Sequence, residues 1–265
     1  MVKIDSSLIK ELRLKSGGGI IDCRNALINS GGNINEAMIF LKKNGLIKAE
    51  KKNNNIALKG IIDILINKDV GYMLELNCET DFVAQHIDFI NFAKYILNIC
   101  FTNNIKNLQS LKLLCEEKRV KLVSVFGENI IIRRIYIIKG ENILCYLHRN
   151  KIGVLIRTNS TNYDLIKNIA MHIAANNPIY LSKEEIPIDI LEDERKIQFD
   201  IAINNGKKQF IAKKIVNGKM DKFIKSLCLL EQNLVMSADI LVKDLIMKNS
   251  IIIFEFIRFE CGEIF

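Results

Sequence analysis

One short stretch of the sequence, Thr80-Asp81-Phe82-Val83, carries side chains that could bind a partner. It separates a strand pattern from a helix pattern, so we expect it to form a strand-to-helix turn. Thr80 or Asp81 could cap the helix, with Phe82 folded back onto it as a hydrophobic staple. Alternatively, the Asp81 carboxylate and the Phe82 ring project together from the turn, as aromatic anchors of protein interfaces do. The residue types alone favour the first interpretation.

Two histidines and a glycine cluster are the other candidates for chemistry. His148 ends a strand pattern beside a basic segment, where its imidazole could contact a partner or simply be solvated. His172 lies within the apolar stripe of a helix pattern, so we expect it to be packed in the core. Gly17-Gly18-Gly19 follows a helix and has no lysine placed to reach a phosphate, so we interpret it as a corner between helices.

The sequence contains none of the common enzyme motifs. The phosphate loop, the G-x-S-x-G nucleophile elbow and the H-E-x-x-H zinc helix are all absent. The 7 cysteines are odd in number and form no C-x-x-C pair, so we expect free thiols rather than a zinc site or a disulfide framework. The sequence therefore predicts no catalytic residue, no cofactor and no metal site.

Composition and charge limit the class of protein. Hydrophobic residues make up 49% of the 265-residue chain, which is enough to bury a core. Lys+Arg is 38 against 30 for Asp+Glu, and this net charge of +8 permits an anionic partner without identifying one. The charged N-terminus does not resemble a signal peptide, and no apolar run approaches 18 residues. We therefore expect a soluble cytoplasmic protein that does not contact a membrane.

The elements that position these residues begin with a small helical unit, residues 1–50. Helical periodicity recurs in three short segments, which are separated by glycine corners. The third segment is expected from about Asn35 to Lys43 and to stop at Asn44-Gly45. The polar residues 51–55 show no periodicity, so we interpret them as a linker.

From residue 56 the pattern predicts strands and helices of a duplicated core. Two hairpins are expected, which turn at residues 67–69 and 139–142. A strand, a turn and a helix that start near Tyr72 are repeated from Gly153. This pattern predicts an α+β fold with helices on one face of an antiparallel sheet. The N half would span residues 56–140, and the C half would be residues 141–187 and 228–265.

Residues 188–227 predict two charged amphipathic helices joined by Asn204-Asn205-Gly206. So short a joint makes the helices antiparallel, as in a helical hairpin, and their lengths suit a protruding arm. After the hairpin, the sequence predicts a helix at residues 239–249 and a closing strand at residues 251–260.

Short motifs recur in order along nearly the whole chain. They are Leu8-Ile9-Lys10-Glu11-Leu12-Arg13, Gly17-Gly18-Gly19, Asp22-Cys23-Arg24-Asn25-Ala26-Leu27, Asn77-Cys78-Glu79-Thr80-Asp81-Phe82-Val83-Ala84, Gly127-Glu128-Asn129-Ile130 with Arg133-Arg134, Ile169-Ala170-Met171-His172-Ile173-Ala174-Ala175, and Phe256-Ile257-Arg258-Phe259-Glu260. Together they resemble bacterial elongation factor Ts, the guanine-nucleotide exchange factor for EF-Tu. The motif around Thr80 is the most diagnostic of the set.

The resemblance implies a layout and a mechanism. Residues 1–50 are similar to the ubiquitin-associated-like (UBA-like) module that docks on the G domain of EF-Tu, and residues 188–227 to the coiled-coil arm of the family. In the family, the Asp-Phe pair enters the G domain next to the nucleotide site. Phe82 would wedge between helices there with Asp81 beside it, which would disturb Mg²⁺ coordination and loosen GDP. Thr80 and Val83 would complete this partner-binding turn.

The resemblance also implies further contacts and partners. By similarity, the additional EF-Tu contacts would be Ile20, Ile21, Asp22, Arg24, Phe126, Gly127 and His148. The partner would be EF-Tu in its GDP-bound and nucleotide-free forms, with no covalent chemistry and no need for direct nucleic-acid binding. The helical hairpin could contact EF-Tu or join two copies in a homodimer. Many family members continue past the position of Phe265 into a C-terminal module, so we expect a weaker affinity without it.

Two other functions remain open at this point. The first is a basic RNA- or ribosome-binding module without exchange activity, whose binding would fall steeply with salt. Clustered Lys and Arg with interleaved aromatics would support it, and the sequence suggests no such cluster. The second is an adaptor whose helical module binds ubiquitin-like partners, in which Phe82 would have no role.

Overall fold

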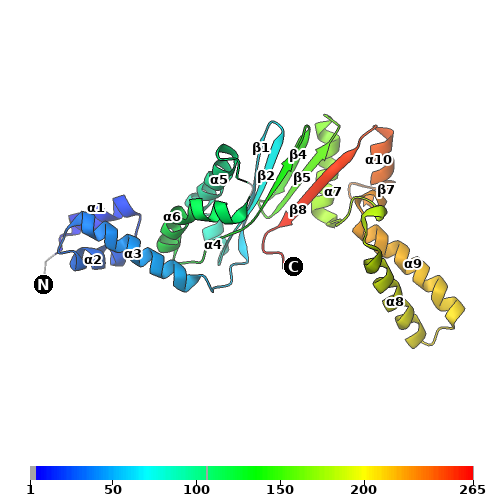
Figure 1. Ribbon diagram of the computed structural model, residues 1–265, viewed down its shortest axis with the longest axis horizontal. Helices are drawn as coiled ribbons and strands as arrows, with labels where there is room; N and C mark the ends of the chain where they lie inside the picture. The colour runs from blue at the N-terminus through cyan, green and yellow to red at the C-terminus, as the bar shows by residue number, and fades with distance from the viewer. Residues whose placement is uncertain (1–3, 106, 265) are drawn as a thin grey trace.

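The computed structural model describes residues 4–105 and 107–264 and has a mixed helix and sheet, α+β, architecture. Two three-stranded antiparallel sheets form the centre of the molecule. Helices cover the outer side of each sheet, three helices lie at the N-terminal end, and a pair of helices projects from the opposite end (Figure 1).

The three N-terminal helices pack on one another around a small core. They are α1 (Ser6–Ser16), α2 (Ile20–Asn29) and α3 (Ile34–Lys52). Gly17 adopts a φ of 72° and ends α1, as the expected glycine corner requires, and the side chain of Asn33 caps α3. The buried residues of this core are Leu12, Cys23, Ala26, Leu27 and Ala37.

α3 is longer than the sequence predicted. The expected stop at Asn44-Gly45 is wrong, because the helix continues to Lys52 and includes the first two residues of the expected linker. A glycine inside a helix costs about 1 kcal/mol relative to alanine. Here Gly45 is buried against Val120 and Ser124 of α6 (Leu108–Phe126), so the packing between the two helices offsets that cost.

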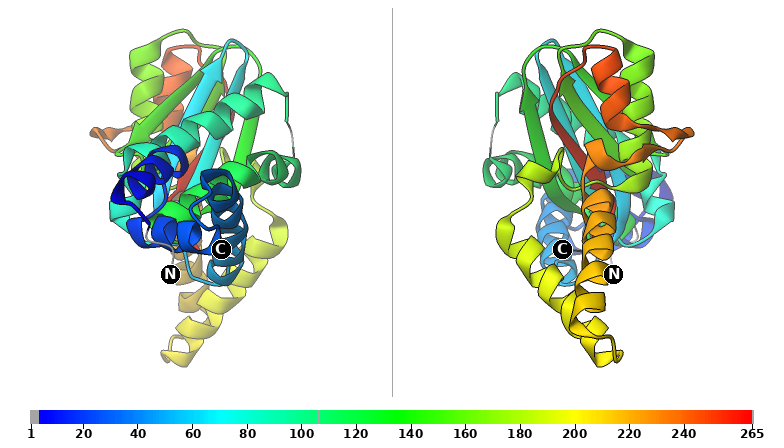
Figure 2. Two further views of the ribbon diagram at one scale, coloured as in Figure 1. Left: turned by 90° about the vertical axis from the view of Figure 1, so that its left-hand side faces the viewer. Right: turned by 90° about the vertical axis from the view of Figure 1, so that its right-hand side faces the viewer.

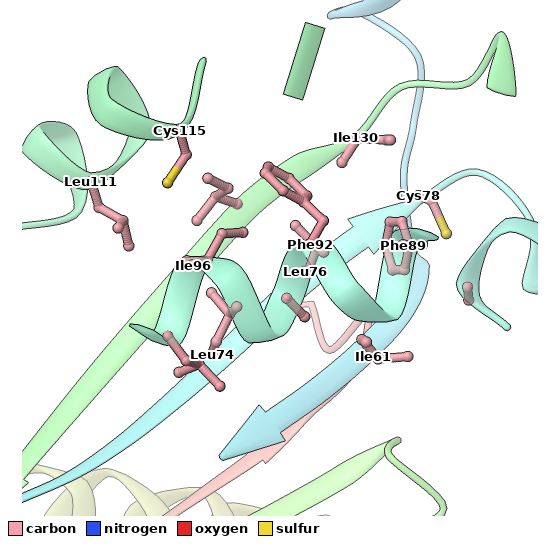
Figure 3. Close-up of a cluster of buried hydrophobic side chains, with 14 of the residues drawn as sticks. Ile61, Leu74, Leu76, Cys78, Phe89, Phe92, Ile96, Leu111, Cys115 and Ile130 are labelled. Carbon is pink, nitrogen blue, oxygen red and sulfur yellow. The ribbon is translucent and has the colours of Figure 1, made fainter. Parts of the chain in front are cut away.

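The first sheet has the strand order β1-β2-β3. β1 (Lys59–Asn67) and β2 (Val70–Cys78) form the first expected hairpin, and β3 (Ile131–Lys139) pairs with β2. α5 (Ile87–Thr102) and α6 pack on one face of this sheet and bury its apolar side chains (Figure 3). Residues that belong to this layer are Ile61, Leu74, Leu76, Cys78, Phe89, Phe92, Ile96, Leu111, Cys115 and Ile130.

The second sheet has the strand order β4-β5-β8. Its strands are β4 (Ile143–His148), β5 (Ile152–Thr158) and β8 (Ile253–Glu260), so the last strand returns to the second half of the core as expected. α7 (Tyr163–Asn176) and α10 (Val242–Lys248) supply the apolar side chains that cover its outer face.

The hairpin expected at residues 139–142 is wrong in its pairing. β3 pairs with β2, whereas β4 pairs with β5, so the chain crosses here from one sheet to the other. The two sheets pack against each other through Ile62 and Met73 on one side and Leu155 and Phe259 on the other. A Cβ at Gly153 would lie 2.5 Å from Ile62 Cγ2, so glycine is needed where β5 packs against β1.

Two long helices, α8 (Ile188–Asn204) and α9 (Gln209–Leu227), pack along each other and project from the body of the molecule (Figures 1 and 2). The helix expected at residues 239–249 is shorter than predicted. β7 (Ser237–Leu241) pairs with β6 (Asn233–Leu234), so these backbone groups bond in a ladder and α10 begins only afterwards. Short 3-10 turns lie at Lys183–Glu185 and Leu229–Glu231.

Across residues 4–105 and 107–264, none of the helices is both long enough and apolar enough to cross a lipid bilayer.

Candidate functional site

Phe82 is an exposed aromatic side chain on a rigid support. It lies on α4 (Asp81–Ala84), a single helical turn that follows β2, and it is 90% exposed. The next two residues, Val83 and Ala84, are buried in the core beneath it. The hydrophobic staple expected for Phe82 is therefore wrong, since the burial of its neighbours turns its ring towards solvent.

Thr80 caps the turn, as the sequence indicated. Its hydroxyl accepts a hydrogen bond from the backbone N–H of Val83 at 3.5 Å. The same hydroxyl donates to Glu128 Oε1 at 2.6 Å, while Glu128 Oε2 accepts from the backbone N–H groups of Glu79 and Thr80. The turn is thus held both by its own cap and by a carboxylate from the segment after α6.

Asp81 is held by two lysines: Lys59 is the first residue of β1, and Lys151 lies in the turn between β4 and β5. Its carboxylate lies 2.7 Å from Lys151 Nζ and 3.6 Å from Lys59 Nζ. The hydrogen bond from Lys151, together with the positive charge of both lysines, holds the pKa of the Asp81 carboxyl below its ordinary value. Lys151 also donates to the carbonyl of Gly60 at 2.9 Å, so the ammonium joins the β4–β5 turn to β1 at this end of the sheets.

Phe126 and Gly127 lie at the end of α6, next to the residue that binds Thr80. Gly127 has a φ of 71° and closes the helix through a 2.8 Å hydrogen bond to the carbonyl of Val123. The Phe126 ring packs edge-on against His86, with the ring centroids 5.0 Å apart. The structure therefore brings this predicted pair to the same end of the first sheet as Thr80.

His148 is exposed at the end of β4. Its Nδ1 shares a 3.0 Å hydrogen bond with the hydroxyl of Tyr146. A two-residue turn, Arg149-Asn150, then leads to Lys151, which binds Asp81. The predicted His148 thus lies on the β-turn that supports the Asp81 side of the site.

The predicted residues of α2 lie in the three-helix unit rather than at α4 (Figure 1). Ile20 is 56% and Ile21 74% exposed, and Arg24 is also exposed. Asp22 accepts two hydrogen bonds from Lys48 Nζ, at 2.8 and 2.9 Å. The structure therefore divides the predicted contact residues into two surfaces, one on α2 and one around α4.

The sequence analysis missed a buried carboxylate beneath this end of the sheets. Glu75 is fully buried, and its two oxygens bind Arg133 at 3.0 Å and Arg134 at 2.6 Å. The backbone N–H of Gly262 donates to the same carboxylate at 2.8 Å. The adjacent arginines in a strand pattern were the available signal, because two neighbouring cations in a core strand require an anionic partner.

His172 is buried, which confirms the prediction that it is a core residue. Its Nε2–H donates to Gln232 Oε1 at 2.9 Å, and its Nδ1 accepts from the backbone N–H of Val235 at 3.2 Å. Burial lowers the pKa of His172 below its ordinary value. The neutral imidazole therefore joins α7 to the segment that contains β6.

No group of three or more His, Cys, Asp or Glu side chains is arranged to hold a metal ion in the part of the chain that the structure describes. The cysteines carry free thiols, as expected. Burial raises the pKa of Cys78 and of Cys100 to about 12, so both remain protonated at neutral pH.

Comparison with known proteins identifies the family of this chain. The family model described as "Elongation factor TS" matches residues 79–263. Elongation factor Ts of Buchnera aphidicola subsp. Acyrthosiphon pisum (strain 5A) is 43% identical over 261 residues, which cover 98% of this chain and 97% of the relative. Elongation factor Ts of Photorhabdus laumondii is 41% identical over 265 residues, 99% of this chain and 94% of the relative. The chain belongs to the elongation factor Ts family.

Proposed function

We propose that this chain is a guanine-nucleotide exchange factor for EF-Tu, which binds EF-Tu·GDP and inserts the Asp81-Phe82 turn near the nucleotide and Mg²⁺ site. The single observation that carries the proposal is the 90% exposure of Phe82 beside a carboxylate on a firmly held turn. An apolar ring left in water on a rigid support is suited to insertion into a partner's pocket.

The proposed mechanism is thermodynamic rather than covalent. GDP is held largely through its phosphates and the Mg²⁺ ion, so displacing the groups that coordinate the ion weakens a highly charged ligand. A factor that binds nucleotide-free EF-Tu more tightly than EF-Tu·GDP must weaken GDP binding by the same ratio. GTP then enters and releases the factor.

The second contact surface in this proposal is α2. Residues 1–50 act as a UBA-like module, and the exposed Ile20 and Ile21 dock it on the G domain. Phe126, Gly127 and His148 flank the α4 turn and contact EF-Tu from the core. Residues 188–227 form the coiled-coil arm, which contacts EF-Tu or joins two copies as a homodimer.

One observation favours RNA binding as a second candidate function, and it corrects the expectation that the chain has no lysine cluster with an aromatic residue. Every lysine of α9 and the loop before it, from Lys207 to Lys225, is exposed. Phe210 on the same helix is 70% exposed, and Lys214 Nζ lies 4.7 Å from its ring centroid. Lysines with an exposed aromatic ring suit a nucleic-acid backbone.

Release of fluorescently labelled GDP from EF-Tu, followed by stopped flow, tests the exchange proposal. We expect the chain to accelerate release strongly, and Phe82→Ala to reduce that acceleration by about 30-fold, because a central interface anchor contributes about 2 kcal/mol or more. Phe254→Ala is the matched control, since it removes a 48% exposed ring from β8 instead.

Two results would contradict the proposal. If a folded Phe82→Ala variant accelerates GDP release as much as the wild type does, Phe82 does not act as the inserted anchor. No effect of the wild-type chain on GDP release, together with RNA binding that falls steeply with salt, would favour the second candidate.

A further inference from the structure

We propose that the carboxylate of Glu128 positions the turn formed by Thr80 and α4. The carboxylate fixes the backbone before α4, so that Phe82 is presented to the partner. The inference rests on the proposed function, because it assigns a role to Glu128 in that same turn. Glu128 comes from a different part of the chain, 48 residues after Thr80.

The geometry around Glu128 uses both carboxylate oxygens. Oε2 accepts from the backbone N–H of Glu79 at 3.1 Å and of Thr80 at 3.0 Å. Oε1 accepts from the Thr80 hydroxyl at 2.6 Å. Hydrogen bonds to an ionised acceptor are shorter and stronger than neutral ones, so three of them on one carboxylate define its position closely.

A reciprocal bond holds Glu128 in place. The neighbouring Asn129 donates its backbone N–H to Glu79 Oε1 at 2.7 Å, so each of the two loops binds the other through a carboxylate. Burial alone would raise the pKa of Glu79, but the hydrogen bonds from Asn129 and Asn55 bring the pKa below its ordinary value. The Asn129 side chain is buried and donates to the carbonyl of Asn55 at 2.9 Å. Residues 53–55 are therefore bound to the site rather than being a free tether.

α4 needs such an anchor because it is only one turn long. A helix of 4 residues has no independent stability, since nucleation costs more than one or two hydrogen bonds return. Val83 and Ala84 fix the turn from below, whereas Glu128 fixes its entry from β2. Loss of either leaves the direction of the Phe82 ring undefined, and errors of about 1 Å in positioning can cost on the order of 100-fold in rate.

The test compares Glu128→Ala with Glu128→Gln in the full chain. Alanine removes every acceptor, whereas the glutamine oxygen can still accept from both backbone N–H groups and its amide can donate to the Thr80 hydroxyl. We expect Glu128→Ala to lower the maximal rate of GDP release at saturating factor by about 10- to 100-fold. Glu128→Gln should restore most of that rate. The affinity for EF-Tu·GDP should change much less than the maximal rate, because the α2 surface is untouched.

The control is Glu116→Ala, which removes a carboxylate of α6 that binds Arg119 at 2.7 Å instead of the turn. A second readout uses the chain alone. Amide hydrogen exchange at Glu79 and Thr80, measured by NMR, should be on the order of 10-fold faster in Glu128→Ala and near wild type in Glu128→Gln.

The outcomes separate this inference from the proposed function. If Phe82→Ala abolishes exchange but Glu128→Ala keeps the wild-type maximal rate, the positioning role is overturned and the wedge stands. If Phe82→Ala exchanges normally, the insertion of Phe82 in the proposed function fails, and with it the role of Glu128 in presenting that ring. If Glu128→Ala does not fold, Thr80→Val and Thr80→Ser are compared instead. A lower maximal rate of GDP release with valine and its recovery with serine support the inference. Equal maximal rates in the two variants overturn it.

Discussion

Asp81 and Phe82 are neighbours in the chain but lie in different environments. Phe82 contacts almost nothing within the molecule, whereas Asp81 is bound by Lys151 and Lys59 before any partner arrives. The carboxylate therefore has a fixed position and a full negative charge at neutral pH, because its pKa is lowered rather than raised.

Replacing Lys151 with methionine keeps most of the side-chain volume and removes the ammonium that binds Asp81. We expect the pKa of the Asp81 carboxyl to rise towards its ordinary value of about 3.9, because only the more distant Lys59 remains. A carboxyl NMR titration measures this. Lys15→Met is the control, since it frees Glu11 instead. An unchanged Asp81 pKa in Lys151→Met would show that another group causes the shift.

Glu75 is the residue whose loss should most affect stability. Glu75→Ala leaves Arg133 and Arg134 without their buried carboxylate, and breaking a buried ion pair from one side costs about 3 to 5 kcal/mol. Chemical denaturation gives the free energy of unfolding. Glu117→Ala, which breaks an exposed pair with Lys42, should change the free energy of unfolding far less. Similar values for both variants would contradict the assigned role of Glu75.

At the residue scale, the sequence located the turn but not what holds it. Capping by Thr80 could be predicted because the cap joins Thr80 to Val83, which is close to it in the sequence. Glu128 and Lys151 are 48 and 70 residues from their partners in the turn, so no local pattern could pair them. The outward direction of Phe82 depends on the core beneath α4, which sequence spacing does not describe.

Among the elements, α7 is tied to β6 by a histidine that must stay neutral. His172 accepts from Val235 through Nδ1, and protonation would replace that acceptor with a donor. Because its pKa is lower in the folded chain than the 6.5 of the unfolded one, the unfolded state binds more protons below pH 6.5. Stability should therefore fall as the pH decreases from 6.5 towards the folded pKa.

Denaturation at several pH values from 7.5 to 5 measures this effect. In His172→Gln the group that titrates is absent, so the slope of unfolding free energy against pH in this window should be smaller than in the wild type. Equal slopes in the two proteins would assign the pH dependence to other groups.

Local and non-local signals explain which elements were predicted. The β1–β2 hairpin was found because a two-residue turn separates its strands. The β3–β4 pairing failed because a short polar turn looks the same whether the chain folds back or crosses to another sheet. The helix stop at Gly45 failed because contact with α6 outweighs a local glycine penalty.

On the scale of the whole molecule, the α8–α9 arm is joined to the body at a narrow base. The backbone N–H groups of Ile179 and Tyr180 both donate to the carbonyl of Leu227, at 2.8 and 3.0 Å, so the segment that leads to α8 is bound to the C-terminal end of α9. The buried residues Ala202, Ala212, Val216 and Met220 lie within the arm itself.

Replacing residues 189–225 with a short Gly-Ser linker should therefore leave both sheets folded. We expect the free energy of unfolding of the remaining core to change by less than about 1 kcal/mol, because a short loop closes the same ends at little entropic cost. Chemical denaturation and the amide NMR spectrum of the two sheets test this. Loss of the dispersed amide signals of β4, β5 and β8 would mean that the arm supports the core.

The strand order β4-β5-β8 also has a consequence for synthesis on the ribosome. The first sheet has all its strands once Lys139 has been made, but β5 must wait for β8, which begins at Ile253. Chains grow at about 5 to 20 residues per second, so one edge of β5 stays open for on the order of 5 to 20 s in every new molecule. An unpaired edge is a template for pairing with another chain, which makes this interval the period when the nascent chain is most exposed to aggregation.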